Sequence, residues 1–224
     1  MQNQTDPLLW RNGDVPISSR FDDPFFSLED GAAETRHVFL QGNDLPHRYR
    51  TGFHIAELGF GTGLNLLVAW EAWCAYGIST PLRYTSFEAF PMDPSDMARA
   101  HRAFPPFEGR RDALLEAWTP QGGVLALPGL IAEVIIGDAR LTLPAWEGCA
   151  DAWFLDGFSP AKNPELWSRD LLLQVGAHTA AHGTAATYTA AGFVRRALAD
   201  AGFEVARVAG YGRKRHMTWA KKTP

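Results

Sequence analysis

The sequence has 224 residues, of which 46% are hydrophobic, and a formal net charge of -4. This length and composition fit one large α/β domain with a modest extension. The acidic balance argues against a protein that is basic over its whole surface. No apolar run approaches the ~20 residues of a membrane-spanning helix. Because residues 1–6 are polar and do not resemble a signal peptide, we expect a cytoplasmic protein without contact to a membrane.

Residues 1–50 differ in composition from the rest of the chain. They are rich in Asp, Asn, Pro and aromatic residues and lack strong periodicity. Pro16, Pro24 and Pro46 interrupt any long helix or strand. We expect short hairpin strands near residues 14–17 and a short helix near residues 31–38, in an N-terminal extension that packs on a core domain of residues 51–224.

From residue 54 onward, strand and helix patterns alternate, which predicts βαβ units and a parallel sheet. The expected strands cover residues 53–58, 83–88, 132–136, 152–155, 184–189, 204–208 and 216–220. The expected helices cover residues 63–76, 94–103, 112–118, 164–177 and 191–201. The last two strands are separated by a loop rich in Gly, Arg and Lys and form a hairpin.

Three glycines follow the first strand of the core at every second position. Residues 55–65 read IAELGFGTGLN, with Gly59, Gly61 and Gly63 after an apolar strand and before a helix. Such a turn lets the backbone come close to a ligand. The GxGxG spacing differs from the GxGxxG of dinucleotide-binding proteins. Together with the carboxylate of Glu57, it indicates S-adenosylmethionine, with Asn65 lining the start of the helix; ordinary structural glycines are the alternative.

Acidic residues also end the next two strands of the expected parallel sheet. Glu88 could accept hydrogen bonds from both ribose hydroxyls of the cofactor. Asp138 could accept from the adenine amine, while the neighbouring amide of Ala139 donates to the ring. The alternatives are a solvated strand-end Glu88 and an Asp138 that only caps a helix. In register with the glycine turn, these residues favour an α/β Rossmann-like class I methyltransferase fold, with a seven-stranded, mostly parallel sheet and an antiparallel last strand.

The most specific chemical signal is the string DGFSP at residues 156–160, which follows an apolar strand. It has the form of the loop that amino-group methyltransferases place beside the methyl donor. We therefore expect Asp156 and Phe158 to be catalytic and count Asp156 among the cofactor-binding residues as well. The attacking amine has an ordinary pKa near ~10 and must lose a proton, which a dry pocket and Asp156 would promote. A structural turn is the alternative.

Positive charge gathers at the C-terminal end of the sequence. Residues 195–224 hold eight Lys and Arg residues and two acidic residues, on a chain that is acidic overall. A local basic face suits a protein that grips phosphates at one place; a solvated hairpin is the alternative. Cys74 and Cys149 lie far apart, and the seven histidines show no ligand spacing. We therefore expect no metal and no disulfide framework.

These residues carry a family resemblance that extends over nearly the whole chain. The sequence resembles the methyltransferase domain of the bacterial MnmC enzymes and its stand-alone form, MnmD. The segments that match are FDDPFFS (21–27), ETRHVFL (34–40), GFGTGLN (59–65), DAWFLDGFSPAKNP (151–164), TAAGFVRR (189–196) and GRKR (212–215). The resemblance implies methylation of 5-aminomethyl-2-thiouridine at the tRNA wobble position, giving the 5-methylaminomethyl form. It also implies that Phe26 and Ser27 line the cofactor pocket.

The resemblance extends to partners. It implies that the chain binds the tRNA anticodon stem-loop and that another enzyme supplies the aminomethyl group. We expect no flavin, since the flavin-dependent domain of the bifunctional relatives is not part of this sequence, and we expect a monomer. The residues expected to hold phosphates are Lys162, Arg195, Arg196, Arg213, Lys214 and Arg215.

Three other functions stay open at this point. The first is an N-methyltransferase that acts on a small-molecule or protein amine. The second is a nicotinamide-dependent oxidoreductase, which would need Gly where Asn65 stands. The third is an inactive scaffold that binds S-adenosylmethionine, against which the intact acidic positions argue.

Overall fold

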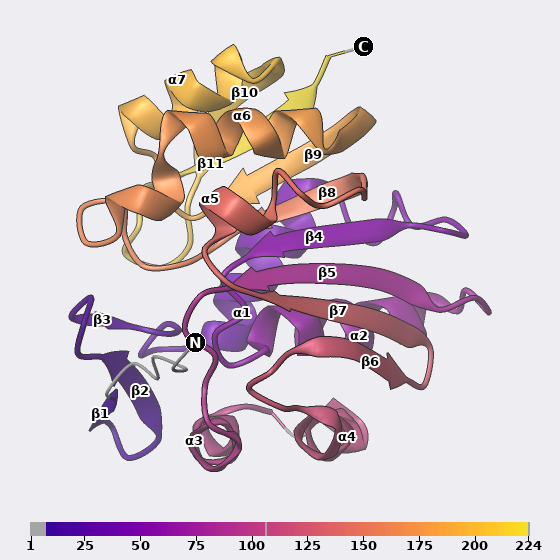
Figure 1. Ribbon diagram of the computed structural model, residues 1–224, viewed down its shortest axis with the longest axis vertical. Coiled ribbons are helices and arrows are strands. Elements are labelled where there is room, and N and C mark those ends of the chain that lie inside the picture. The colour runs from indigo at the N-terminus through magenta and orange to yellow at the C-terminus, as the bar shows by residue number, and fades with distance from the viewer. Residues whose placement is uncertain (1–7, 106, 224) are drawn as a thin grey trace.

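The computed structural model describes residues 8–105 and 107–223. The polar N-terminus, residues 1–7, lies outside the described residues. Within them the chain forms a central sheet of eight strands (Figure 1). Their spatial order is β10 (Phe203–Ala209), β11 (His216–Lys222), β9 (Thr179–Thr187), β8 (Ala150–Leu155), β4 (His54–Leu58), β5 (Leu82–Glu88), β7 (Leu130–Ile136) and β6 (Gly123–Leu127).

The direction of the strands confirms the predicted mostly parallel sheet. Neighbouring strands from β9 through β8, β4 and β5 to β7 run parallel. The last strand, β11, runs antiparallel to both β9 and β10. The predicted number of seven strands is wrong, because β6 adds an antiparallel edge strand beside β7. The exposed Val124 and buried Leu125 alternate as a strand requires, but only over five residues before a Pro-Gly turn.

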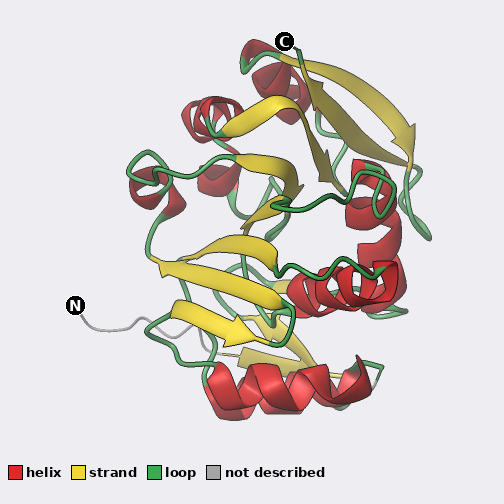
Figure 2. Cartoon of the chain, turned by 90° about the vertical axis from the view of Figure 1, so that its right-hand side faces the viewer, coloured by secondary structure: helices red, strands yellow, loops and turns green. Residues whose placement is uncertain are grey.

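Helices cover both faces of the sheet (Figure 2). One layer contains α1 (Gly31–Thr35), the π-helical turn η1 (Arg36–Leu40), α2 (Leu64–Tyr76), α3 (Pro94–Ala100) and α4 (Arg110–Ala117). The opposite layer contains α5 (Ala139–Thr142), α6 (Arg169–Ala177) and α7 (Gly192–Asp200). Ile55 and Phe154 pack into the first layer, and Ala56 and Trp153 into the second, because successive strand residues point to opposite faces. Both faces are buried, which explains the near-continuous apolar strands.

The predicted helix at residues 164–177 is divided in two. A short 3-10 turn, η5 (Pro164–Trp167), ends at Ser168, whose extended backbone (ψ 146°) then precedes α6. Three further 3-10 turns are η2 (Gln41–Asn43), η3 (His101–Ala103) and η4 (Phe107–Gly109). None of the helices in the described ranges is long and apolar enough to cross a membrane.

The N-terminal segment shares the core of the sheet. It begins with a small antiparallel sheet, β1 (Leu8–Arg11), β2 (Val15–Ser18) and β3 (Asp23–Pro24). Further along, Val38, Phe39 and Leu45 are buried in the same hydrophobic cluster as Ile55. This segment therefore contributes core residues as well as the loop that leads toward the carboxyl ends of the strands.

A buried amide joins this segment to the sheet. The side-chain nitrogen of Asn43, which is 0% exposed, donates to the carbonyl oxygens of Phe39 at 2.9 Å and Trp153 at 3.3 Å. Its side-chain oxygen accepts from the hydroxyl of Thr184 at 2.6 Å. Three elements, η1, β8 and β9, thus converge on one side chain.

Asn43→Ala should lower the free energy of unfolding by about 1–3 kcal/mol, because it removes three buried hydrogen bonds that join η1, β8 and β9. Urea denaturation monitored by circular dichroism measures this change. Gln41→Ala is the matched control, since Gln41 is exposed two residues away, and it should change stability by less than about 0.5 kcal/mol. Equal effects of the two substitutions would contradict a structural role for this amide.

Candidate active site at the carboxyl edge of the sheet

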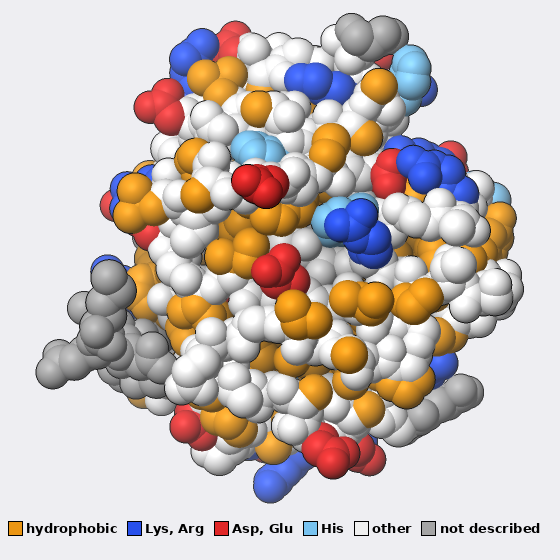
Figure 3. All heavy atoms as spheres, turned by 45° about the vertical axis from the view of Figure 1, so that its right-hand side comes forward, with side chains coloured by type: hydrophobic (Ala, Val, Ile, Leu, Met, Phe, Trp, Pro, Cys, Tyr) orange, Lys and Arg blue, Asp and Glu red, His pale blue; other side chains and the backbone are white. Residues whose placement is uncertain are grey.

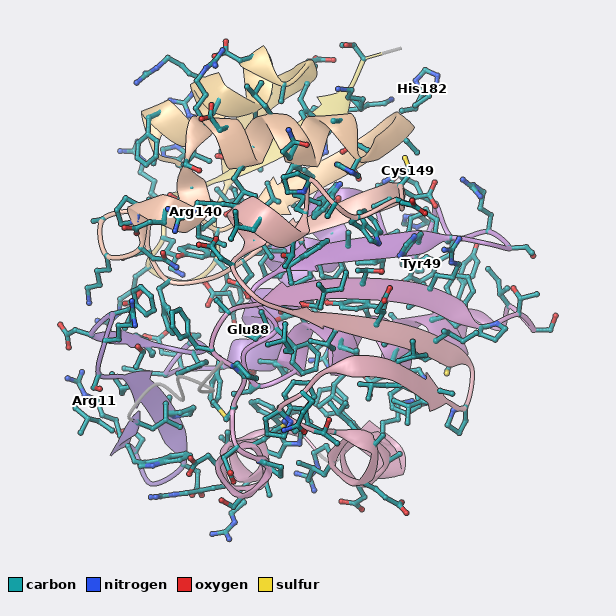
Figure 4. All side chains as sticks on the ribbon, viewed as in Figure 1. Arg11, Tyr49, Glu88, Arg140, Cys149 and His182 are labelled. Atoms are coloured by element: carbon teal, nitrogen blue, oxygen red, sulfur yellow. The ribbon has the colours of Figure 1, made fainter. Side chains whose placement is uncertain are left out.

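A cavity of about 970 Å³ lies where the parallel strands end. In Figure 4 the labelled Glu88 and Arg140 lie at this edge, and Cys149 and His182 lie toward the opposite one. The structure places most of the sequence-predicted residues on its wall. These are Phe26, Ser27, Gly59, Gly61, Asn65, Glu88, Asp138, Ala139, Asp156, Phe158, Lys162, Arg213 and Lys214. Five others do not line it: Glu57, Gly63, Arg195, Arg196 and Arg215.

The turn after β4 requires glycine for two separate reasons. Gly59 and Gly61 have φ angles of +84° and +53°, which residues with a side chain rarely adopt. A Cβ atom on Gly59 would also lie 3.3 Å from the Cα of Gly157, and one on Gly61 would lie 3.2 Å from the ring of Phe25. The turn therefore brings its backbone against the loop after β8 and against the N-terminal segment. Gly63 instead packs toward Leu114, away from the cavity.

Glu57 lies beneath the cavity rather than on its wall. It is 0% exposed, and its carboxylate accepts hydrogen bonds from the side-chain nitrogen of Asn65 at 2.8 Å and the hydroxyl of Ser86 at 2.7 Å. Burial raises the pKa of Glu57 well above its ordinary value. This placement differs from the expected direct contact with a ligand. Glu57 supports a residue of the wall instead.

That residue is Asn65, the second residue of α2. Its side-chain nitrogen donates to Asp156 at 2.7 Å, and its oxygen accepts from the hydroxyl of Thr35 at 2.8 Å. The second oxygen of Asp156 accepts from the backbone N–H of Gly157 at 2.8 Å. Burial raises the pKa of Asp156 to about 6, although both donated hydrogen bonds oppose the shift. Thr35 was not predicted from the sequence, since nothing there links it to α2.

Glu88 is held by two backbone amides. One oxygen accepts from Gly61 at 2.8 Å and the other from Phe90 at 2.7 Å. Burial raises the pKa of Glu88, and the backbone hydrogen bonds oppose that shift. Each carboxylate oxygen has two lone pairs, so Glu88 keeps acceptor capacity at the cavity wall.

Asp138 caps a helix and also lies on the cavity wall, so it fits both of the alternatives that the sequence left open. Its side chain caps α5 by accepting from the backbone N–H of Arg140 at 2.9 Å, and the Arg140 guanidinium forms an ion pair with it at 2.6 Å. These hydrogen bonds lower the pKa of Asp138. Both residues line the cavity, so the cap orients a carboxylate toward the cavity. Arg140 was not predicted from the sequence.

The DGFSP loop is packed against the N-terminal segment. The ring of Phe158 stacks on Phe21 with 4.8 Å between centroids and meets the ring of Phe25 edge-on at 5.0 Å. The backbone N–H of Ser159 donates to Asp23 at 2.8 Å. On the other side, the hydroxyl of Tyr188 donates to the carbonyl of Gly157 at 2.8 Å. An aromatic wall next to Asp156 results, and most of it comes from residues that the sequence did not single out.

Three basic residues that line the cavity, Lys162, Arg213 and Lys214, are paired with acidic ones. Lys162 contacts Asp22 and Asp23 of the N-terminal segment. Arg213 lies 3.3 Å from Glu29 and Lys214 lies 2.8 Å from Glu34, while the ammonium of Lys214 also lies 4.1 Å from the ring centroid of Tyr188. The loop between β10 and β11 is thereby tied across the cavity to the segment that precedes and forms α1.

Arg195, Arg196 and Arg215 lie outside this cavity. Arg195 and Arg196 belong to α7, and Arg196 borders a smaller hollow with Arg169 and Phe193. Figure 3 shows the side of the molecule where the parallel strands begin, opposite the cavity. On this side, basic and acidic side chains are interspersed. Among the described residues, no three His, Cys, Asp or Glu side chains come together as a metal site would need.

The raised pKa of Asp156 generates a stability prediction. Its pKa rises from an ordinary 3.8 to about 6 on folding, so the folded state binds this proton more tightly and loses stability as pH rises between these values. Asp156→Asn cannot ionise. Relative to the native chain it should therefore gain on the order of 1–3 kcal/mol between about pH 4 and about pH 8.

Thermal or urea unfolding at several pH values measures this difference. Glu116→Gln, which neutralises an exposed carboxylate on α4, should show no such pH dependence. A difference between Asp156→Asn and the native chain that stays constant with pH would contradict the burial of an ionisable group.

The chain is similar to known methyltransferases. A family model described as an S-adenosyl-L-methionine-dependent methyltransferase matches residues 112–223, which is half of the chain. A curated relative from Vibrio cholerae serotype O1 (strain M66-2), the "tRNA 5-methylaminomethyl-2-thiouridine biosynthesis bifunctional protein MnmC", is 41% identical over 236 residues. The match covers 94% of this chain and 34% of that protein. The chain thus spans about a third of the length of the curated relatives it matches.

Solved structures agree with this assignment. The crystal structure of MNMC2 from Aquifex aeolicus superposes with a TM-score of 0.81 and 27% identity, and covers 100% of this chain and 72% of that one. TrmN from Thermus thermophilus has a TM-score of 0.52 and 18% identity over 86% of this chain and 48% of that chain, which supports the fold alone. The chain therefore belongs to the family of S-adenosyl-L-methionine-dependent methyltransferases whose family model matches residues 112–223.

Proposed function

We propose that this methyltransferase acts on the primary amine of 5-aminomethyl-2-thiouridine at the wobble position of tRNA. The observation that carries the proposal is the position of Asp156 and Phe158, side by side on the cavity wall at the glycine turn. A carboxylate can bind an amine, and an aromatic ring can stack on the base that bears it. The name of the Vibrio cholerae relative places that protein in the biosynthesis of 5-methylaminomethyl-2-thiouridine, which supports this substrate.

The cavity suits S-adenosylmethionine, which supplies a methyl group on a positively charged sulfur. Gly59 and Gly61 line the cavity, and their positive φ angles let the bare backbone of the turn form part of its wall. We assign Glu88 to the ribose hydroxyls, since its oxygens keep lone pairs beyond the two backbone bonds. We assign Asp138 and Ala139 to the adenine. From the N-terminal segment, Phe26 and Ser27 complete the wall.

Asp156 has the properties of an acceptor for the proton of the amine. A pKa of about 6 leaves its carboxylate ionised at neutral pH and still basic enough to receive a proton. Its Oδ1 and Oδ2 are oriented by Gly157 and Asn65. The aromatic wall of Phe21, Phe25 and Phe158 excludes water, which favours the neutral amine. The chain then holds the nitrogen in line for attack, and this positioning is its main contribution to the rate.

The tRNA would extend beyond the cavity. We assign Arg195, Arg196 and Arg215, which lie outside it, to phosphates of the anticodon stem. Lys162, Arg213 and Lys214 are paired with acidic residues in this structure, so they would have to exchange these partners for phosphates. A separate activity must supply the aminomethyl group, and we expect this chain to act as a monomer without flavin or metal.

Nucleoside analysis tests the substrate. After incubation with labelled S-adenosylmethionine, tRNA that carries 5-aminomethyl-2-thiouridine should contain labelled 5-methylaminomethyl-2-thiouridine, and tRNA without that modification should contain none. Asp156→Ala should lower the rate by about 10²–10⁴-fold, because it removes the proton acceptor. Its affinity for S-adenosylmethionine, measured by calorimetry, should change little.

Label in free amines or proteins but not in tRNA would favour the rival substrate class, a small-molecule or protein amine. Normal turnover of Asp156→Ala would remove Asp156 from the mechanism. Absence of binding of both S-adenosylmethionine and its demethylated product would contradict the proposed site itself.

Charge reversal tests the phosphate contacts. The double variant Arg195→Glu and Arg215→Glu should raise the KM for tRNA about tenfold or more at low salt, because it removes two phosphate contacts, and it should make binding less dependent on salt. Binding of S-adenosylmethionine should be unchanged. Arg83→Glu is the control, since Arg83 is exposed at the amino end of β5. Intact tRNA binding by the double variant would show that these residues do not hold the stem.

A further inference from the structure

Asn65 uses nearly all of its hydrogen-bonding capacity within the protein. Its two amide protons go to two different carboxylates, Glu57 Oε1 at 2.8 Å and Asp156 Oδ2 at 2.7 Å. Its oxygen accepts from Thr35 Oγ1 at 2.8 Å. Asn65 and Thr35 are only 6% and 4% exposed. No donor of Asn65 is left for a ligand, because the side chain has two amide protons and both are used.

This arrangement fixes which end of the amide faces Asp156. If the amide were turned over, its oxygen would point at the ionised carboxylate of Asp156, and like partial charges would repel each other. The hydroxyl of Thr35, donated from α1, holds the oxygen on the opposite side. Glu57, held in turn by Ser86, supplies the second acceptor. Three separate elements therefore define one orientation.

We propose that Asn65 is a positioning residue that holds the carboxylate of Asp156 ready to accept a proton, rather than a residue that binds the cofactor. The proposal rests on the proposed function, in which Asp156 receives the proton of the substrate amine. A hydrogen bond donated to a carboxylate stabilises its charged form. Asn65 thus keeps a buried Asp156 ionised in the neutral range, with Thr35 and Glu57 as its anchors.

Several charged or titratable groups also face Asp156. Glu57 lies on β4, Glu34 on α1 and Lys214 on the loop between β10 and β11. The phenols of Tyr84 on β5 and Tyr188 after β9 lie near it as well. Substitution of Asn65 or Thr35 by an apolar residue leaves all of these groups in place. Neither variant adds or removes a titratable group; Asn65→Leu also removes the hydrogen bond donated to Glu57, whereas Thr35→Val leaves that bond in place.

The test is a titration of the Asp156 carboxyl by carbon-13 NMR, together with the pH profile of kcat/KM. Asn65→Leu is close in size and cannot donate a hydrogen bond. It should raise the pKa of Asp156 by about one unit, a tenfold change in proton affinity, and move the acid limb of the profile upward by the same amount. Affinity for S-adenosylmethionine should stay within about threefold, about 0.65 kcal/mol or less.

A second variant, Thr35→Val, allows the test to be made even if Asn65→Leu does not fold. Thr35→Val removes only the anchor of the amide oxygen, so the shift should have the same sign and be smaller. Thr35→Ser keeps the hydroxyl and should keep the native acid limb. Thr85→Val is the matched control, because it removes another buried hydroxyl, one that contacts His54 and not Asn65; it should leave the Asp156 titration unchanged.

An unchanged Asp156 titration in Asn65→Leu and Thr35→Val would overturn the proposal. A large loss of S-adenosylmethionine affinity without a shift in the titration would also overturn it, since it would mark Asn65 as a cofactor contact. The NMR titration needs no turnover. If the shift occurs but Asp156→Ala remains active, the proposed role of Asp156 fails while the effect of Asn65 on its protonation stands.

Discussion

The cavity wall depends on two carboxyl groups, those of Glu57 and Asp156, that share the amide of Asn65. Glu57 lies on β4, and Asp156 lies in the loop after the neighbouring parallel strand β8. The side chain of Asn65 donates one amide proton to each carboxyl group. Withdrawing these carboxyl groups from water raises the pKa of both, and the hydrogen bonds donated to them partly oppose that shift. The glycine turn makes this possible, because only a chain without side chains at Gly59 can bring β4 so close to Gly157.

The N-terminal segment forms part of the cavity wall at the carboxyl edge of the sheet. It supplies the hydroxyl of Thr35, the rings of Phe21 and Phe25 and the carboxylate that holds the backbone of Ser159. The same segment is tied to the sheet by Asn43. Stability of the fold and geometry of the site are therefore coupled, since displacing this segment would remove the aromatic wall and the anchor of Asn65 together.

Charge at the mouth of the cavity is balanced within the protein. Glu29 and Glu34 neutralise Arg213 and Lys214 of the loop between β10 and β11. The pair of Arg213 with Glu29 is exposed, and exposed pairs stabilise a fold by little. Under the proposed function, phosphates of tRNA would therefore compete for Arg213 at low cost. The same pairs join the two sides of the cavity.

The sequence by itself determined the class of fold and the edge of the sheet at which the cavity lies. The alternation of apolar strands and helices predicts a parallel sheet, because it is a local periodicity of the sequence. Acidic residues at or just after the strand ends, Glu57, Glu88, Asp138 and Asp156, then predict one common edge. The sequence also predicted the tight turn after β4, because the spacing of Gly59, Gly61 and Gly63 can be read from neighbouring residues alone. The extra strand β6 was missed because its alternation spans only five residues.

Only the tertiary structure decided what each polar side chain does. Glu57 lies beneath the cavity, Lys214 pairs with Glu34, and Asp138 caps α5. The hydroxyl of Thr35 contacts Asn65, and that of Tyr188 contacts the loop after β8 at Gly157. These contacts join residues up to 180 positions apart in the chain. Periodicity reports which face of an element is buried, but hydrogen-bond partners depend on how whole elements pack, and no local pattern contains that information.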